Sequence, residues 1–444
     1  MAHVVIIGNG ISGVTAARHI RKNSDYQITI ISAETDHFWS RTAIMYIYMG
    51  HMKFENTKPY EDWFWKKNKI DLLNDFVEGI DIKNNLLQLK QRGELRYDKL
   101  ILATGAKPNF FGWPGQDLEG VSGMVSYQDL QYIEKNTEGI NCGVIVGGGL
   151  IGVELAEMLS SKQINVTFLV RENQFWSNVL PEQEASLISR HIREHHIDLR
   201  LGTELKEILP DENGRVRAII TSDGDEIPCQ FVGLTAGVHS NIDLAKESGI
   251  ETNRGILVNE YLETNAPNVY AIGDCAERKD PLPNRRPVEQ VWYTGRMMGE
   301  TVAQTITGNQ TQYLPGNWFN SAKFFDIEYQ TYGWVWNQLK KNEEEFYWEH
   351  KSGKKCMHFI FDKDSKLFLG VNTFGIRLRH ESFDQWLTEK RDIFYVLENL
   401  REANFDPEFF DRHEQEIVTA FNQLNPQHPI RLKGKKSLLE AIFG

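Results

Sequence analysis

Three glycines near the start of the chain, Gly8, Gly10 and Gly13, have the spacing G-x-G-x-x-G. This spacing is typical of a turn that binds the diphosphate of a dinucleotide. The first glycine permits a tight turn, the second lets the phosphates approach the backbone, and the third lets a helix and a strand pack closely. Glu34, which could accept hydrogen bonds from a ribose diol, follows somewhat beyond the usual spacing of about 20 residues.

The elements that must hold these residues follow from the flanking sequence. Val4–Ile7 is a run of β-branched apolar residues that predicts a buried strand, Val14–Ile20 has the apolar periodicity of a helix, and Gln27–Ser32 predicts the next strand. Strand, turn and helix in this order place the turn at the positive end of the helix, where an anion is stabilised. The stretch therefore predicts a dinucleotide-binding fold and not an ordinary glycine turn.

The same pattern occurs a second time. Gly143–Leu159 repeats the first motif, with Gly147, Gly149 and Gly152 at the matching places. The two motifs are offset by 147 − 8 = 139 residues, which is too long for a solenoid repeat and suits two nucleotide-binding folds in one chain. The protein is therefore expected to bind two dinucleotides.

The strand predicted after the second motif, Asn165–Val170, leads directly into Arg171 and Glu172. At this point an acid accepts hydrogen bonds from the ribose of NADH, whereas a base binds the 2′-phosphate of NADPH. Arg171 favours NADPH, while Glu172 favours NADH and would repel the phosphate. The choice between NADPH and NADH stays open, with a slight preference for NADPH.

Length, charge and cysteine usage limit the class of protein. A chain of 444 residues predicts two or three domains, and a formal net charge of −12 argues against nucleic acid as a partner. The four cysteines are widely separated, without C-x-x-C or metal-ligand spacing, so no metal site is expected. The first strand leaves no room for a signal peptide, and no apolar run approaches the about 18 residues of a membrane span. A cytoplasmic protein is expected.

Two further stretches carry a resemblance to a known family. Tyr97–Pro108 (YDKLILATGAKP) reads as a strand that ends in a turn, and Asn268–Ala276 (NVYAIGDCA) as a strand that ends in a glycine and an acid. Together with the two glycine motifs, in this order, they resemble the pyridine nucleotide–disulfide oxidoreductase superfamily over about residues 1–335. The resemblance implies an α/β fold with two Rossmann-like domains, plus a C-terminal α+β domain with a helical extension.

The resemblance also implies a domain order and two cofactors. FAD would occupy the first motif, in a discontinuous domain of residues 1–112 and 242–312, and NADPH or NADH the second, in residues 113–241. Residues 313–444 would form the C-terminal domain, which could join two copies into a homodimer. A helix over Pro287–Thr307 would direct its positive end at the flavin, and Pro287 suits a first helical position.

Site residues are carried over from the family one by one. Arg41 would lie near the flavin and the diphosphate, and Glu154 near the nicotinamide and the flavin; both are candidate catalytic residues, although each also suits a plain charged position on a helix. Thr104 and Lys107 either line the flavin or form a simple turn. The implied FAD-binding residues are Gly8, Gly10, Gly13, Glu34, Arg41, Thr104, Gly105, Gly273 and Asp274, and the implied NAD(P)H-binding residues are Gly147, Gly149, Gly152, Arg171 and Glu172.

Cysteine positions discriminate between members of this superfamily. Members that reduce disulfides carry a C-x4-C after the ribose acid, and the corresponding stretch here, Phe38–Gly50, contains no cysteine. A thiol relay is therefore not expected, and the chain is similar to rubredoxin and ferredoxin reductases and to nitrite reductase flavin domains. The predicted activity is an FAD-dependent NAD(P)H oxidoreductase that passes electrons to a small redox protein or metal centre. Reduction of a quinone or another diffusible acceptor, or a non-catalytic flavin-bound interaction protein, remains an alternative.

An electron-transfer partner that is acidic would need a basic docking surface, and three clusters could provide one or could be ordinary solvated charges. They are Arg278–Lys279 with Arg285–Arg286, Arg377 and Arg379 with Lys390–Arg391, and Arg431 with Lys433, Lys435 and Lys436.

The last third of the chain is rich in aromatic residues and predicts an antiparallel sheet followed by helices. Phe346–Glu349, Cys356–Phe361 and Lys366–Val371 alternate like strands. Ser382–Ala403 and residues 406–424 have the periodicity of amphipathic helices. The tail, residues 431–444, could form a short helix on a membrane surface, although membrane attachment is not expected.

Overall fold

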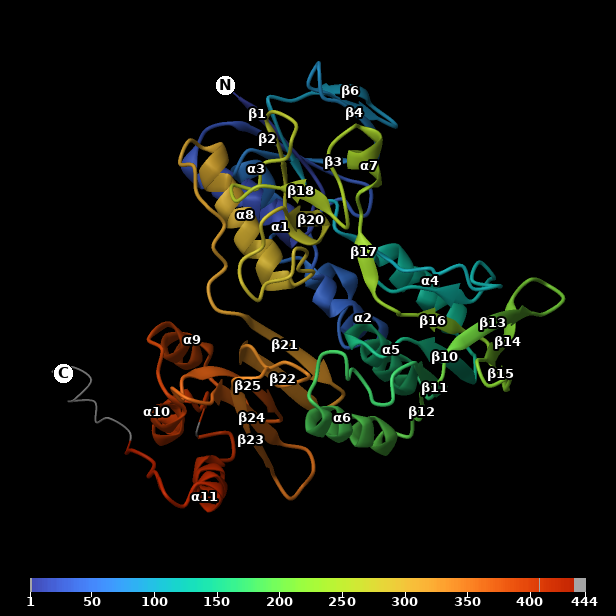
Figure 1. Cartoon of the computed structure of the whole chain (residues 1–444). Coiled ribbons are helices and arrows are strands. Elements are labelled where there is room, and N and C mark those ends of the chain that lie inside the picture. Colours follow the sequence, from blue (N-terminus) through green and yellow to red (C-terminus); the bar gives the residue numbers. More distant parts are fainter. Residues whose placement is uncertain (1, 407, 435–444) are drawn as a thin grey trace. The chain divides into compact units, whose positions relative to one another are not determined.

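The computed structural model describes residues 2–406 and 408–434, so the predicted tail helix at residues 438–443 lies outside the described residues. The chain forms two compact units. Unit 1 comprises Met1–Gly147, Leu155–Thr167 and Glu204–Pro315, and unit 2 comprises Gly148–Glu154, Phe168–Thr203 and Gly316–Gly444 (Figure 1). The three-domain division expected from the sequence stays a prediction.

Unit 1 is built on a parallel sheet with the strand order β19-β7-β1-β2-β3. These strands are β1 (His3–Ile7), β2 (Gln27–Ser32), β3 (Ile70–Asn74), β7 (Lys99–Leu102) and β19 (Val269–Ala271). All neighbouring pairs are parallel, with β1 between β2 and β7. The central strand β1 carries a run of buried apolar residues because both faces of the sheet are covered. The two strands predicted around the first glycine motif are thus confirmed, and β2 has the predicted bounds.

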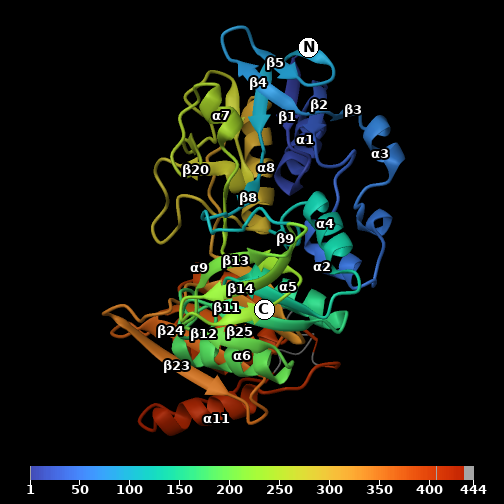
Figure 2. The same cartoon turned by 90° about the vertical axis from the view of Figure 1, so that its right-hand side faces the viewer.

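Two helices of unit 1 pack closely against each other, α1 (Ile11–Asn23) and α8 (Trp292–Ile306), which run side by side in Figures 1 and 2. A side-chain carbon at Gly295 would lie 2.6 Å from Ser12 Oγ, and one at Gly299 would lie 2.6 Å from the Ser12 carbonyl oxygen. Two glycines one turn apart therefore let the helices approach without intervening side chains.

The predicted start of α8 at Pro287 is wrong, because the helix begins at Trp292. The carbonyl oxygen of Pro287 instead accepts a hydrogen bond from the backbone N–H of Arg278 at 2.9 Å. Pairing with a strand keeps the proline in extended chain. Glu289, also before the helix, accepts a hydrogen bond from Thr294 at 3.2 Å and pairs with Arg285 at 3.1 Å.

A second parallel arrangement belongs to the second glycine motif. In unit 1, β10 (Cys142–Val146) pairs with β16 (Val232–Leu234), which pairs with β9 (Val121–Ser122). The helix α5 (Leu150–Ser161) and the strand β11 (Asn165–Val170) follow β10, as predicted. The other elements of unit 1 are α2 (Ile44–Tyr48), α3 (Asp62–Lys67), β4 (Val77–Asp81), β5 (Leu86–Leu89), β6 (Gly93–Arg96), β8 (Ala106–Pro108), α4 (Tyr127–Thr137), β13 (Leu205–Pro210), β14 (Val216–Thr221), β15 (Glu226–Pro228), β17 (Val238–Ser240), α7 (Asp243–Glu247), β18 (Ile256–Val258) and β20 (Ala276–Arg278).

Unit 2 contains an antiparallel sheet with the order β21-β22-β25-β24-β23. The strands are β21 (Phe319–Phe324), β22 (Ile327–Gly333), β23 (Glu343–Glu349), β24 (Cys356–Asp362) and β25 (Phe368–Phe374), so the sheet predicted for this region is confirmed. A core rich in aromatic side chains forms between one face of the sheet and the C-terminal helices. Unit 2 also contains α6 (Glu182–Glu194), β12 (Asp198–Leu201), α9 (His380–Thr388), α10 (Ile393–Glu398) and α11 (Glu414–Leu424).

The single helix predicted over Ser382–Ala403 is wrong, because the chain turns sharply between α9 and α10. Lys390 has a positive φ of 53°, and the Asp392 side chain caps α10 by accepting a hydrogen bond from Tyr395 N at 2.7 Å. The carbonyl oxygen of Arg391 also accepts a hydrogen bond from Phe368 N of the sheet. Tertiary pairing and the aspartate cap therefore override the helical periodicity. The other predicted helix is confirmed only from Glu414 onward.

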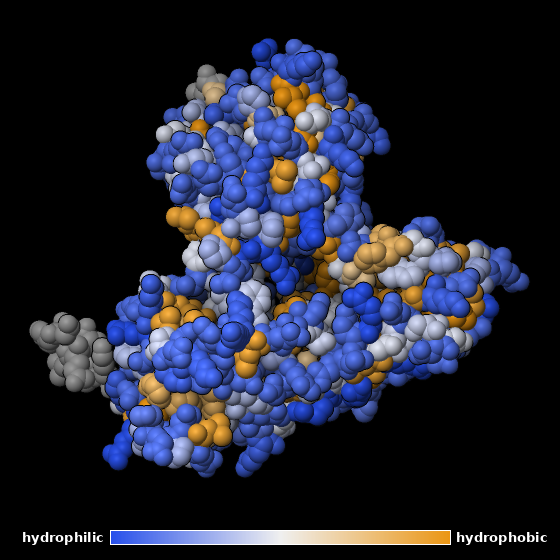
Figure 3. Space-filling view, viewed as in Figure 1, coloured by the Kyte–Doolittle hydropathy of each residue, from blue (hydrophilic) through white to orange (hydrophobic). Residues whose placement is uncertain are grey.

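On the face shown in Figure 3 polar side chains predominate, and apolar residues form separate patches. Among the residues that the structure describes, no helix combines the length and apolarity needed to span a membrane.

A buried charged network ties α6 to the sheet of unit 2. His358 of β24 is 0% exposed, and its ring contacts Glu184 Oε1 of α6 and Glu345 Oε2 of β23, both at 3.0 Å. The other Glu184 oxygen accepts a hydrogen bond from Asn372 of β25 at 2.8 Å. Burial lowers the pKa of His358, but the two carboxylates outweigh this and raise it to about 9. The imidazolium is the form that the fold stabilises.

This network predicts a pH-dependent stability of unit 2. Because the folded pKa of His358 lies above its ordinary value of about 6.5, the stabilisation is fully present below pH 6.5 and is lost as the pH rises toward 9. The free energy of opening β24 should fall by about 3 kcal/mol over this range. Amide hydrogen exchange of β24, corrected for intrinsic rates, measures it. The His358→Gln variant should lose this slope and the exposed-site control His196→Gln should keep it; an identical slope in all three proteins contradicts the assignment.

Candidate functional site: two glycine turns and a charged cavity

The first glycine turn is so tight that it admits no side chain at two positions. Gly8 has a φ of 113°, and a side-chain carbon there would lie 2.1 Å from the carbonyl oxygen of Ala103. A side-chain carbon at Gly13 would lie 2.1 Å from the carbonyl oxygen of Gly8. The turn joins β1 to the N-terminus of α1, where the free backbone N–H groups can bind an anion.

A cavity of about 600 Å³ opens beside this turn within unit 1. Its walls come from the turn, the end of β2, the segment after β7, the start of α4 and the segment around Asp274. The charged residues of the wall are predominantly acidic. The acids are Glu34, Asp75, Glu78, Asp243, Glu247 and Asp274, and the cations are Arg41 and Lys107.

Arg41 lies at the centre of the charge distribution in this cavity. Its guanidinium pairs with Glu34, and one of its nitrogens lies 3.2 Å from where a side-chain carbon of Gly10 would be. The cation therefore lies over the second glycine of the turn. Burial lowers the pKa of Arg41 from its ordinary value, and the carboxylate of Asp274 partly offsets this effect.

Glu34 is held by more than Arg41. Its Oε1 accepts a hydrogen bond from the backbone N–H of Tyr127 at 2.9 Å, and its carbonyl oxygen accepts one from Gln128 Nε2 at 2.8 Å. The sequence analysis did not find these α4 partners. The available signal was the capping pair of Ser126 and Asp129, which marks the start of α4. The predicted contact of Glu34 with a ribose stays a prediction.

Asp274 contributes a second carboxylate to the same cavity. It lies in a short 3₁₀ turn, Gly273–Cys275, directly after β19, as the motif predicts for a strand that ends in a glycine and an acid. Burial raises the pKa of its carboxyl group to about 6, although the positive charge of Arg41 lowers it. A carboxyl group with this pKa can accept a hydrogen bond from a sugar-chain hydroxyl at neutral pH.

The segment after β7 also lines the cavity, but its side chains already have partners. Thr104 Oγ1 donates a hydrogen bond to the Asn241 carbonyl oxygen at 2.7 Å, and Lys107 Nζ pairs with Asp243 at 2.6 Å. Gly105 has a φ of 72°. Here β8 and β17 pair as antiparallel strands, so the segment after β7 and the segment before α7 lie side by side. A flavin could contact the backbone of this segment.

The second glycine turn, like the first, has no room for a side chain at its first glycine. Gly147 has a φ of 119°, and a side-chain carbon there would lie 2.6 Å from the Thr235 carbonyl group. A side-chain carbon at Gly149 would meet nothing within 4 Å, which leaves the backbone open to a phosphate. Gly152 is buried in α5, and Glu154 lies partly buried on the same helix.

Arg171 and Glu172 follow β11, and they pair with each other. Arg171 Nη2 lies 3.1 Å from Glu172 Oε1, with side-chain exposures of 71% and 26%. The more exposed arginine and the partly buried acid can both reach a ribose bound at the strand end, so the geometry leaves the choice of nucleotide open.

No cysteine is among the residues that line the cavity, and the four cysteines of the described chain are free. Cys275 is next to Asp274 in sequence, but its sulfur points into the core toward the carbonyl oxygens of Leu102 and Ile272. Burial raises the pKa of Cys275, and it raises the pKa of Cys229 to about 12. Both thiols are therefore held in their unreactive protonated form.

Two glycine turns on parallel strands and an acidic cavity with a central arginine define a dinucleotide-binding flavoprotein. Residues 2–302 match the pyridine nucleotide-disulphide oxidoreductase family, and the chain belongs to this family. An NADH oxidase of Methanocaldococcus jannaschii is 32% identical over 340 residues, which are 73% of this chain and 74% of the relative. A rubredoxin-NAD(+) reductase of Acinetobacter baylyi is 30% identical over 323 residues, 70% of this chain and 80% of the relative.

The fold is shared with solved flavoprotein reductases. A ferredoxin reductase from Rhodopseudomonas palustris superposes with a TM-score of 0.78 at 21% identity, covering 92% of this chain and 96% of that chain. The α/β fold class, the cofactors FAD and NAD(P)H, and an FAD-dependent NAD(P)H oxidoreductase are thereby confirmed. The cavity fits FAD, because the glycine turn and Arg41 suit its diphosphate and the acids suit its hydroxyl groups.

The geometry of Arg41 predicts its contribution to FAD binding. Arg41→Ala removes a charge-assisted hydrogen bond to the diphosphate and should raise the Kd of FAD by about 10- to 100-fold. Titration of the apoprotein with FAD, followed by flavin fluorescence, measures this. Lys107→Ala is the matched control, since Lys107 is the other cation that lines the cavity but, unlike Arg41, does not lie over Gly10. Equal Kd values for the two variants would exclude Arg41 as a diphosphate ligand.

Nucleotide preference provides a second prediction. Glu172→Ala should raise the ratio of kcat/KM for NADPH over that for NADH by about 10-fold, because a ribose acceptor and a charge that repels the phosphate are both removed. Arg171→Ala should shift the ratio in the opposite direction. Steady-state kinetics with each nucleotide measures both. A ratio that neither variant changes would place the selection elsewhere.

Proposed function

We propose that NAD(P)H reduces the bound FAD and that the flavin passes its electrons directly to a small redox protein or a metal centre. Hydride chemistry is supplied by the two cofactors, and the chain binds and orients them. In this proposal the FAD-binding part is residues 1–112 and 242–312, and the NAD(P)H-binding part is residues 113–241.

The observation that carries the proposal is the set of groups around the cavity. The wall contains backbone turns, carboxylates and two cations, and none of its residues is a cysteine. The only thiol adjacent in sequence to the wall, Cys275, is fully buried with a raised pKa. Among the described residues no thiol lines the cavity, which supports transfer of electrons from a flavin directly to an acceptor outside the chain. A relative named rubredoxin-NAD(+) reductase supports an electron-transfer protein as that acceptor.

Acids of the same chain pair with at least one residue of each of the three basic clusters. Lys279 pairs with Glu251 at 2.8 Å, and the buried Arg285 pairs with Glu289. Pairs in the other two clusters are Arg377 with Glu328, Arg391 with Glu389 and Lys433 with Glu398, while Lys435 and Lys436 lie outside the described residues. An acceptor would therefore dock by a surface with mixed charges, and its rate of reduction should depend only weakly on salt.

Electron stoichiometry tests the proposal. Anaerobic titration of the FAD-loaded protein with dithionite should consume two electrons per flavin, because no disulfide accepts a second pair. The absorbance of the oxidised flavin follows the end point. Consumption of four electrons per flavin would reveal a redox-active disulfide and overturn the proposal.

The acceptor class is then measured on the same reduced protein. Stopped-flow reoxidation with a ferredoxin, a rubredoxin, a quinone and O2 should be fastest with one of the two iron–sulfur proteins. Faster reoxidation by the quinone or by O2 would establish the diffusible-acceptor alternative. Failure of both NADH and NADPH to reduce the flavin would leave the non-catalytic interaction protein.

A further inference from the structure

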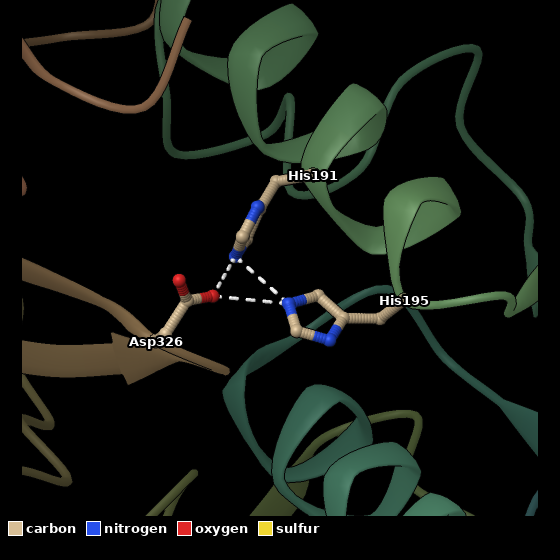
Figure 4. A group of neighbouring side chains, drawn as sticks. All are labelled: His191, His195 and Asp326. Atoms are coloured by element: carbon tan, nitrogen blue, oxygen red, sulfur yellow. Dashed lines mark hydrogen bonds and ion pairs between the residues drawn. The ribbon is translucent and has the colours of Figure 1, made fainter. Parts of the chain in front are cut away.

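Two histidines and an aspartate of unit 2 meet at a point that the flavin chemistry does not involve. His191 lies in the last turn of α6, His195 follows directly after this helix, and Asp326 lies in the two-residue turn between β21 and β22 (Figure 4). The histidines are four residues apart and therefore share one face of the helix. Figure 4 shows both rings directed at the same carboxylate oxygen.

The three ligand-type atoms form a small triangle. His191 Nε2 lies 2.7 Å and His195 Nε2 lies 3.0 Å from Asp326 Oδ1, and the two nitrogens are 3.3 Å apart. Ligand atoms at about 2.0–2.1 Å from a tetrahedral ion lie about 3.3 Å from one another. The triangle thus needs only small movements to become one face of a tetrahedral coordination sphere, with a fourth position left for water.

The surroundings of the triangle contain further charged groups. His191 is 1% exposed. Lys354 lies 3.7 Å from the outer oxygen of Asp326 and 3.7 Å from Glu194, which lies 3.7 Å from His191 Nδ1.

The turn that presents the carboxylate is held against the helix. Phe325 has a φ of 55°, which is uncommon for a bulky residue, and its ring stacks on His195 with centroids 4.2 Å apart and an interplanar angle of 11°. This stacking fixes the plane of the His195 ring. It also fixes the position of Asp326, the next residue, opposite α6.

We propose that His191, His195 and Asp326 bind a divalent transition-metal ion of the zinc class, through two imidazole nitrogens and one carboxylate oxygen. Two nitrogen ligands and one oxygen ligand with an open position favour such an ion over Mg²⁺ or Ca²⁺. The ion would bind the unprotonated Nε2 atom of each ring, and the ring proton of each neutral imidazole would then be on Nδ1. The bound ion would cross-link the end of α6 to the β21–β22 hairpin within unit 2.

A second group of possible ligands, His350, His413 and Glu416, is less suited to a cation. Lys355 Nζ lies 3.0 Å from His413 Nε2, so an ammonium group already contacts one of the possible ligands. In the group around Asp326, the ammonium of Lys354 faces the Oδ2 atom of Asp326 and not a ring nitrogen. This second group supplies the internal comparison for the experiment.

The cysteine spacing predicted no metal site. The pair of histidines four residues apart was a visible signal, but the third ligand is 131 residues from His195 and follows no local pattern.

The proposal predicts one equivalent of bound metal. Isothermal titration of the tag-free, FAD-loaded protein with Zn²⁺ should give one site, and Zn²⁺ should raise the thermal unfolding temperature. His195→Gln and Asp326→Asn should each weaken Zn²⁺ binding more than about 100-fold, since loss of a ligand exceeds the loss of an outer hydrogen bond. Co²⁺ should give the visible bands of a tetrahedral site, read as a difference spectrum.

Both substituted side chains are at least a third exposed, at 34% and 59%, so the fold should persist, and flavin content checks this. His196→Gln, a neighbouring exposed histidine, should bind Zn²⁺ as the parent protein does. An undiminished Zn²⁺ site in both ligand variants, or a site that only His350→Gln removes, would overturn the proposal. So would the absence of Zn²⁺ binding to the parent protein.

Discussion

The position of the N-terminus of α1 depends on a close approach of three backbone segments at Ser12: the start of α1, the turn at Gly273, and α8. A side-chain carbon at Gly273 would lie 2.3 Å from Ser12 Oγ, and one at Gly295 or Gly299 of α8 would lie 2.6 Å from an atom of the same residue. These glycines bring α8 and the turn of Asp274 against the start of α1. The free N–H groups of α1, the carboxyl group of Asp274 and the cation of Arg41 can then face one cavity. A larger side chain at any of these positions would move these groups apart.

Electrostatics in this cavity follow from that packing. Six acids and two cations line the wall, and each cation pairs with an acid, Arg41 with Glu34 and Lys107 with Asp243. A cofactor with a diphosphate can enter such a cavity only where helix N–H groups and Arg41 outweigh the acids. The remaining carboxylates can accept hydrogen bonds from ribose and sugar-chain hydroxyls. One acidic cavity thus suits both the charged and the hydroxylated parts of FAD.

The sequence predicts those parts of this arrangement that depend on residues close to one another in the chain. The glycine spacing reports a steric requirement between neighbouring residues, so both turns and the bounds of β2 and β11 were predictable. Pro287 failed as a helix start because its carbonyl pairs with Arg278, a contact that helix propensity does not contain. The contact of Tyr127 N with Glu34 joins residues 93 positions apart and follows no motif.

In the C-terminal region, too, long-range contacts limit what can be predicted from the sequence. The sheet was predicted, although β24 is buried at six consecutive residues, whereas the continuous helix over Ser382–Ala403 was not found. Its periodicity is genuine, but Lys390 adopts a left-handed conformation and Arg391 bonds to the sheet. Periodicity identifies the faces that are buried, and it does not show where tertiary pairing interrupts the helix.

The ion network of His358 has a mechanical consequence. Glu184 anchors the first turn of α6 to two strands of the sheet through buried charged contacts, and separating them would leave uncompensated charges in an apolar interior. Bending at this junction is therefore costly. If the conformation changes during turnover, we expect α6 and the strands β23–β25 to move as one rigid body. The flexible connections should then lie elsewhere in the chain.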